Sequence, residues 1–236
     1  MGRGSVKVAI LSDIHANIFA LDAVYVDLDR VGVDHILVAG DLVGYYYWPA
    51  DVVSRLASDE RVRCIRGNHE DILEVCMADT QEAIRYAAKY GSGYACCIET
   101  MTPSMLAWLA TLPANLDLTI SGVTFHLSHG ALGSTNTYIY PNAALNVLND
   151  NISDCDVTIF GHTHHPFVYY RGEQILLNPG SVGQPRDQCG TASYIILNLE
   201  NLVIQPRRVM FDVTPVIAAA RARDPELAYL WKIMQR

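Results

Sequence analysis

The stretch VTIFGHTHHP, residues 157–166, places three histidines, His162, His164 and His165, directly after a run of β-branched and aromatic residues. Such a run predicts a buried strand. Imidazoles gathered at the end of a strand are costly to bury without partners, and imidazole is a common ligand of transition metals. Taken alone, the stretch leaves two interpretations open, a solvated loop or a pair of metal ligands.

The first part of the chain alternates strands with helices. Apolar β-branched runs indicate the strands, and apolar residues at helical spacing indicate the helices, the first of which ends at Gly32. The predicted elements are strands at 6–11, 34–41 and 61–67 and helices at 16–32 and 49–60. This alternation predicts parallel strands joined by right-handed crossovers.

The later part of the chain favours strands that pair as hairpins. The predicted elements are hairpins at 115–130, 166–180 and 191–210, a strand at 156–161, and helices at 142–151 and from about Thr214. Between the two parts, residues 70–112 have helical segments at 71–79, 81–90 and 102–112, which predict a helical insert covering one face. We therefore expect an α/β (α+β) fold, with two mixed sheets packed face to face and helices outside, in one domain over residues 1–236.

The composition excludes several classes of function. The 236 residues are half apolar and carry a net charge of −8, which argues against a broad nucleic-acid or membrane-binding surface. The first apolar run is too short for a signal peptide, and the six cysteines lack the spacing of a zinc ribbon or a C-x-x-C motif. We expect free thiols and a cytoplasmic protein.

Five short polar segments follow predicted strands, at the edge where open α/β sheets bind ligands. They are SDIH (12–15), AGD (39–41), RGNHE (66–70), LSHG (127–130) and FGHTHH (160–165). Asp13 and His15 are two residues apart, as are His162 and His164, so that in an extended segment each pair would point to one side and could chelate a metal. Two neighbouring metals need a bridging ligand, for which Asp41 is suited, and the set would be completed by Asn68 and His129.

The ordered motifs D-x-H, G-D, G-N-H-[ED], H-G and G-H-T-H resemble the signature of the calcineurin-like metallophosphoesterases. SDIHANIFAL and LNPGSVGQPRD are similar to the pattern of its small bacterial and archaeal members, and the matching motifs extend from Ser12 to Asp187. The resemblance implies a four-layer αββα sandwich. It also implies two metal sites, one formed by Asp13, His15, Asp41 and His164 and the other by Asp41, Asn68, His129 and His162.

The same resemblance implies the chemistry. A metal-bridging hydroxide would attack the phosphorus, with His69 as the catalytic histidine that protonates the leaving oxygen, and Glu70 as the acidic residue that orients His69. The nitrogen and oxygen ligands suit Mn, Fe, Co, Ni or Zn, of which we favour Mn. A small phosphorylated substrate, with a nucleotide as one candidate, is the expected partner, without stable nucleic-acid or membrane binding and with the oligomeric state open.

The leaving group is not specified by these motifs. A phosphomonoester, a phosphodiester, a cyclic nucleotide or a dinucleoside polyphosphate such as diadenosine tetraphosphate would all fit, and a non-catalytic protein-binding scaffold is the remote alternative. The candidate substrate contacts are Asn17, Tyr45 of the stretch GYYYWP, and Arg186, which could instead form a surface ion pair with Asp187. Residues 131–141 have the length and composition of a lid.

Overall fold

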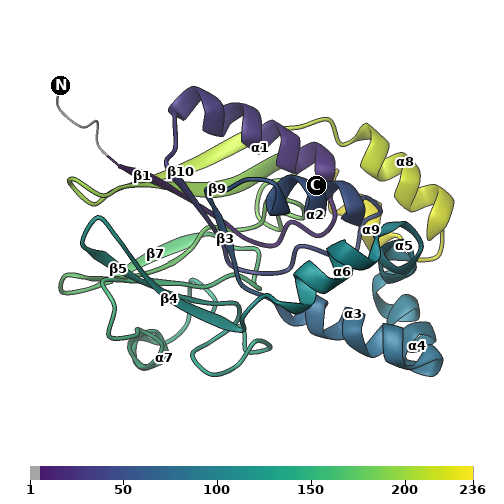
Figure 1. The fold of residues 1–236 in the computed structure, drawn as a ribbon, viewed down its shortest axis with the longest axis horizontal. Helices are drawn as coiled ribbons and strands as arrows, with labels where there is room; N and C mark the ends of the chain where they lie inside the picture. Colours follow the sequence, from purple (N-terminus) through teal and green to yellow (C-terminus); the bar gives the residue numbers. More distant parts are fainter. Residues whose placement is uncertain (1–5, 236) are drawn as a thin grey trace.

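Ten strands form two five-stranded sheets in the computed structural model, which describes residues 6–235 (Figure 1). The first sheet has the order β10-β9-β1-β2-β3 and the second the order β4-β5-β6-β8-β7. The strands of the first sheet are β1 Lys7–Leu11, β2 His35–Val38, β3 Val62–Cys64, β9 Thr191–Asn198 and β10 Val203–Met210. Those of the second are β4 Asn115–Ile120, β5 Val123–Ser128, β6 Val157–Ile159, β7 Phe167–Arg171 and β8 Gln174–Asn178.

Both sheets are mixed. In the first, β1, β2 and β3 are parallel, while β9 runs antiparallel to both β1 and β10. In the second, β5, β6 and β8 are parallel, and β4 and β7 add antiparallel edges. The predicted parallel pairing of the first strands and the predicted hairpins are thereby confirmed.

The helices lie outside the two sheets. They are α1 Ile18–Val31, α2 Pro49–Ala57, α3 Asn68–Ala78, α4 Thr80–Tyr90, α5 Gly93–Thr100, α6 Pro103–Ala110, α7 Leu145–Asp150, α8 Thr214–Arg223 and α9 Tyr229–Lys232. In Figure 1 the sheets lie on the left, and α3 to α6, α8 and α9 gather on the right. The helix α5 was not among the predicted segments, because its sequence GYACCIET begins with glycine and has little helical periodicity.

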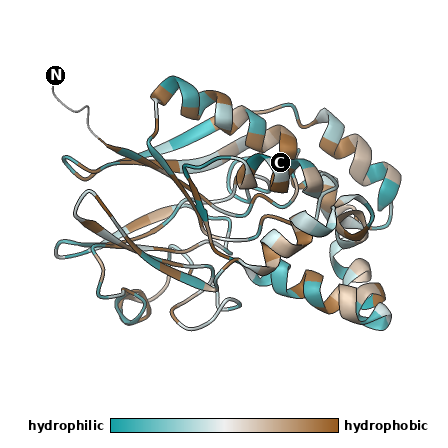
Figure 2. Ribbon diagram, in the orientation of Figure 1, coloured by the Kyte–Doolittle hydropathy of each residue, from teal (hydrophilic) through white to brown (hydrophobic). Residues whose placement is uncertain are grey.

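The core has an apolar layer on each side of the first sheet. Along β1, Val8 and Ile10 join the cluster between the sheets, whereas Ala9 and Leu11 join the cluster that contains the buried face of α1. This alternation is the period of two that a strand buried on both faces requires. Figure 2 shows the corresponding pattern, with hydrophobic residues along the strands and alternating hydrophilic and hydrophobic turns along α1.

The outer face of the second sheet has a smaller cover. There Phe160 and Leu176 pack with Leu148 of α7 and with Ile139 from the preceding loop. The two sheets with helices on both outer sides are the expected sandwich, which confirms the predicted fold class. In the part of the chain that the structure describes, no helix is both long and apolar enough to cross a membrane.

Candidate active site

The predicted metal ligands lie on turns with an unusual backbone. Five of the seven have a left-handed φ, namely Asp13 (54°), His15 (50°), Asp41 (55°), His162 (66°) and His164 (60°). For residues other than glycine this conformation costs about 1–3 kcal/mol each and persists where the surrounding structure enforces it, often at functional sites.

The two pairs of candidate ligands do not lie on extended strands, which corrects that expectation. The strand β1 ends at Leu11, before Asp13 and His15, and β6 ends at Ile159, before His162 and His164. Asp13 and His15 still meet in one group, with His15 Nε2 3.8 Å from Asp13 Oδ1, whereas His162 and His164 fall in different groups, so the expectation that the second pair chelates one metal is wrong.

Carboxylate and imidazole atoms meet in three overlapping groups at the ends of the strands. In each group the candidate ligand atoms lie within 4.8 Å of one another, and every member is buried. The groups are Asp13, His15 and His164; His15, Asp41 and His69; and Asp41, His129 and His162.

Hydrogen bonds to backbone carbonyls set the orientation of three of the imidazoles. The contacts are His15 Nδ1 to Val43 O at 3.1 Å, His129 Nδ1 to Ala39 O at 2.7 Å, and His164 Nδ1 to Gln184 O at 2.6 Å. A carbonyl only accepts, so each Nδ1 has the proton and donates it. Each Nε2 is therefore directed at the shared centre, as in metal-ligating histidines.

The two Nε2 atoms of His15 and His164 lie only 3.0 Å apart. In neutral rings with the proton on Nδ1, neither Nε2 has a hydrogen to donate, so two lone pairs face each other. Asp13 Oδ1 lies 3.3 Å from the Nε2 of His164 and 3.8 Å from that of His15. A cation held by all three residues would satisfy these atoms together, so the first group fits a metal.

Asp41 stands between the two halves of the site. Its Oδ2 lies 3.1 Å from His129 Nε2 and 3.9 Å from His15 Nε2, so one carboxylate faces both groups. Asn68 Oδ1 lies 3.1 Å from the same His129 nitrogen. The Nε2 of His162 is buried and has no hydrogen-bond partner among the described residues. An orphaned imidazole nitrogen beside a carboxylate and an amide oxygen fits a second metal.

The charges in the site favour a cation. Burial alone would raise the pKa of Asp13 and Asp41, but nearby imidazoles, His164 for Asp13 and His129 for Asp41, hold both well below the usual range. Burial lowers the pKa of His162 to about 4. Ionised carboxylates beside neutral imidazoles are the protonation states that bind metals.

His129 is the exception. Burial opposes its charge, but the Asp41 carboxylate raises the pKa of His129 to about 10. The Nε2 position next to Asp41 thus attracts positive charge, and a metal bound there would displace a proton.

The sequence as a whole matches a known family. Residues 6–202 match the calcineurin-like phosphoesterase superfamily domain. The chain belongs to this superfamily. It is 32% identical over 225 residues to an uncharacterized protein of Methanocaldococcus jannaschii, with 87% of this chain and 88% of that protein covered. It is also 25% identical over 207 residues to phosphodiesterase YfcE of Escherichia coli, with 84% and 90% covered.

Solved structures agree. A metallophosphoesterase from Sphaerobacter thermophilus has a TM-score of 0.78 and 26% identity, with 98% of this chain and 99% of that chain covered. The family and its relatives identify the chain as a phosphoester hydrolase and confirm the resemblance found in the sequence.

Glu70 has a different task in this calcineurin-like phosphoesterase from the one expected. Its carboxylate accepts four backbone N–H groups, from Asp41 at 3.0 Å, Leu42 at 2.8 Å, Val43 at 3.1 Å and Gly67 at 2.7 Å. The expectation that it orients the His69 ring is therefore corrected. Glu70 joins the loop that carries Asp41 to the loop that carries Asn68.

Tyr94 of α5 takes the position beside His69. Its hydroxyl lies 2.6 Å from His69 Nδ1, and both side chains are buried. Burial lowers the pKa of His69 to about 4, so the ring is neutral and has one proton. If Nδ1 had that proton, the Tyr94 hydroxyl hydrogen would need another acceptor, and none occurs among the described residues. The Tyr94 hydroxyl therefore donates to Nδ1, and the ring proton lies on Nε2, 4.0 Å from Asp41 Oδ2.

A glycine makes room for this ring. Gly44 has a φ of 83°, and a Cβ atom there would overlap Nδ1 of His69. The close approach of the backbone to His69 therefore requires glycine at this position.

Two of the predicted substrate contacts, Asn17 and Tyr45, have side chains that are largely enclosed by the protein. Asn17 is fully buried and caps α1, accepting from Ala20 N at 3.2 Å and donating to Gly183 O at 2.8 Å. Both polar atoms of its side chain are thus engaged, which corrects the expectation of substrate contact. Tyr45 lies in the site, with its ring 4.7 Å from His15 and 4.8 Å from His69, but it is only 8% exposed.

Arg186 remains available to an anion. Its guanidinium lies 3.3 Å from Gln184 Oε1 and 3.5 Å from the Tyr45 hydroxyl. Asp187 pairs instead with Arg208. The alternative of an ion pair between Arg186 and Asp187 is therefore wrong.

Two exposed tyrosines extend over the site from the loop after β5. The Tyr138 ring stacks on His162 with centroids 3.9 Å apart, and Tyr140 stacks on Tyr138 at 5.7 Å. Neither tyrosine was singled out from the sequence. His165 is not in any of the three ligand groups, and its ring lies 6.0 Å from that of Tyr140.

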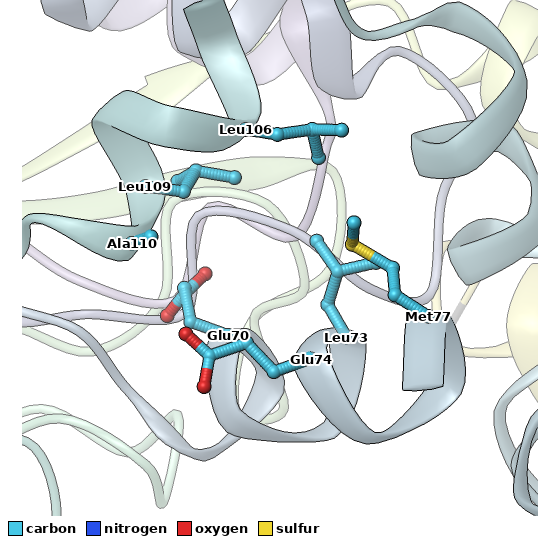
Figure 3. A pocket seen from close by; sticks show the side chains of 7 residues that line it. All are labelled: Glu70, Leu73, Glu74, Met77, Leu106, Leu109 and Ala110. Carbon is cyan, nitrogen blue, oxygen red and sulfur yellow. The ribbon is translucent and has the colours of Figure 1, made fainter. Parts of the chain in front are cut away.

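A small apolar cavity of about 90 Å³ lies between α3 and α6, and none of the seven candidate metal ligands lines it (Figure 3). Leu73 and Met77 line it from α3, and Leu106 and Leu109 line it from α6. The charged groups in its lining are the carboxylates of Glu70 and Glu74, which would repel a phosphate. It is therefore unsuited to the substrate.

Proposed function

We propose that this chain hydrolyses phosphate esters at a pair of divalent metal ions held by seven side chains. The observation that carries the proposal is the common orientation of His15, His129 and His164, whose Nδ1 atoms donate to carbonyls and whose Nε2 atoms meet around Asp13 and Asp41. Family membership supports hydrolysis of a phosphoester as the reaction.

Two ligand sets are proposed, and the distances among their members support them. Asp13, His15, Asp41 and His164 would hold one ion, and Asp41, Asn68, His129 and His162 the other. Asp41 belongs to both sets, because its Oδ2 faces the Nε2 atoms of His15 and His129. Nitrogen and oxygen donors of this kind suit Mn, Fe, Co, Ni or Zn, and we propose Mn.

When bound, two such metal ions lower the pKa of water so that it supplies a nucleophile near neutral pH. They also place positive charge beside the phosphoryl oxygens. The protein adds a proton donor. The neutral His69 ring, oriented by Tyr94, presents its Nε2–H on the side of Asp41, where it can hydrogen bond to the phosphate and protonate the leaving oxygen. Asp41 also accepts the backbone N–H of His69 at 2.9 Å, so one residue positions both the metal site and the acid.

The substrate that we propose is a small phosphodiester. Phosphodiesterase YfcE, which shares 25% of the aligned residues, supports a diester over a monoester. The complete ligand set and the buried His69 argue against the scaffold alternative, because a scaffold needs neither. Of the six free cysteines, Cys64, Cys76, Cys96 and Cys97 are buried, which supports a reducing compartment, and we propose the cytoplasm.

The test is a substrate panel with protein stripped of metal and then reloaded with Mn²⁺. It contains an aryl monoester, bis(p-nitrophenyl) phosphate, a cyclic nucleotide and diadenosine tetraphosphate. We expect turnover only after reloading, higher on bis(p-nitrophenyl) phosphate than on the aryl monoester, and a large loss in His69→Ala with metal content unchanged. Turnover that is equal before and after reloading, or equal in His69→Ala, would contradict the proposal.

A further inference from the structure

A groove of about 300 Å³ opens beside the candidate active site, between α3, α4 and the loop after β5. Asn68 lines the end of the groove at the metal-ligand cluster, and Asn136 lines it from the loop. Tyr86, Lys89 and Tyr90 line it from α4. None of these α4 residues has a place in the reaction described above.

The groove adjoins the reacting centre at Asn68 and Tyr90. The Asn68 amide oxygen lies 3.1 Å from His129 Nε2, and the Tyr90 ring lies 5.0 Å from the His69 ring. A substrate whose scissile phosphate lies among the ligand groups would therefore have its continuation beside α4. This is the position of a specificity site for groups beyond the scissile phosphate.

The charged side chains that line the groove do not all have a partner of opposite charge. Arg85 forms an ion pair with Glu82, and Asp71, also in the lining, forms one with Arg66 at 2.8 Å. Lys89 has no carboxylate within 4.0 Å in the range 6–235 and lies 4.7 Å above the Tyr90 ring. A lone ammonium in a chain of net charge −8 leaves one uncompensated positive charge in the groove.

Aromatic rings accompany this charge. The Tyr86 and Tyr90 rings are nearly parallel, at 13° with centroids 6.1 Å apart. An ammonium beside aromatic faces suits a ligand that combines a further anionic group with a planar ring. A phosphate ester with one phosphate has no group for Lys89, whereas a polyphosphate chain attached to a nucleoside has both.

We propose that the groove binds a second phosphate of the substrate at Lys89, so that the preferred substrates are nucleoside polyphosphate esters. This inference rests on the proposed function, because the first phosphate must lie at the ligand cluster. Tyr86 and Tyr90 form the wall along which the nucleoside lies.

The test compares kcat/KM for diadenosine tetraphosphate with kcat/KM for bis(p-nitrophenyl) phosphate, using the full chain loaded with Mn²⁺. Loss of one charge-assisted hydrogen bond predicts that Lys89→Ala lowers this ratio about tenfold. Lys89→Arg keeps the charge and should preserve most of the ratio. Lys232→Ala, which removes an exposed lysine of α9 outside the groove lining, is the matched control and should leave the ratio at the wild-type value.

A ratio in Lys89→Ala equal to that of the control would overturn the inference. So would a wild-type enzyme that cleaves bis(p-nitrophenyl) phosphate but is neither active on nor inhibited by diadenosine tetraphosphate. If the metal-loaded protein turns over no substrate, the proposed function fails, but the inference about the groove can still be tested by calorimetric titration with diadenosine tetraphosphate. The inference then predicts weaker binding to Lys89→Ala than to the wild type. Equal binding to the two proteins would refute it independently of the proposed function.

Discussion

Replacing Glu70 by glutamine should destabilise the chain strongly although the two side chains have nearly the same shape. The Glu70 carboxylate is 2% exposed and accepts two backbone N–H groups on each oxygen. In Glu70→Gln one oxygen becomes an NH₂ group, so two N–H donors lose their acceptor and face another donor. At about 1–3 kcal/mol for each buried polar group left unsatisfied, the expected loss is about 2–6 kcal/mol.

The assay is urea unfolding of the metal-free chain, followed by circular dichroism. Glu74→Gln is the matched control, because Glu74 lies one turn further along α3 and pairs with Arg66 at the surface with 54% of its side chain exposed. Exposed ion pairs contribute about 0–1 kcal/mol, so the control should unfold nearly as the wild type does. Equal free energies of unfolding for the two variants would refute the role of Glu70 in joining the loops of Asp41 and Gly67.

Two further predictions concern other hydrogen bonds. Tyr94→Phe should slow hydrolysis of a cyclic nucleotide by about tenfold or more, because its alkoxide leaving group needs a proton from His69. Hydrolysis of bis(p-nitrophenyl) phosphate should be slowed much less. An equal effect on both substrates would contradict the orientation of His69 by Tyr94. Burial alone would raise the pKa of Asp27, but hydrogen bonds from Tyr194 and Arg207 outweigh burial, and the pKa is lowered. The ionised Asp27 therefore stabilises the folded chain at neutral pH, and this stabilisation is lost as the pH falls below the usual pKa range of Asp. Asp27→Asn should therefore lose about 1–2 kcal/mol at pH 7 and less at pH 3, measured by urea unfolding; a loss that does not depend on pH would contradict the ionic contribution.

The sequence was sufficient for the strands, most helices and the residues that meet in the three carboxylate and imidazole groups other than His69. Apolar periodicity indicates β1 and α1 directly, and Gly32 ends α1 with a left-handed φ of 68°. The polar segments lie at strand ends because parallel strands bring their carboxyl ends to one edge. Their order along the chain was therefore enough to predict that Asp13, Asp41 and His129 meet.

Tertiary contacts could not be predicted in the same way. Tyr94 lies in α5, which has weak helical periodicity, and it meets His69 only after the chain folds back. The four donors to Glu70 are backbone groups, which leave no trace in the residue types. The left-handed turns at Asp13 and His162 are also hidden, because most residues of these types have a negative φ and the residue type alone does not mark the turn.

The number of metal ions bound per chain tests the two-metal site most directly. Metal-free protein would be titrated with Mn²⁺ and analysed by elemental mass spectrometry, for the wild type, Asp41→Asn, and Asp117→Asn as a surface control. We expect two ions in the wild type and in the control, and the loss of at least one in Asp41→Asn. A wild-type chain that binds fewer than two ions, or an Asp41→Asn variant that keeps both with unchanged affinity, would contradict it.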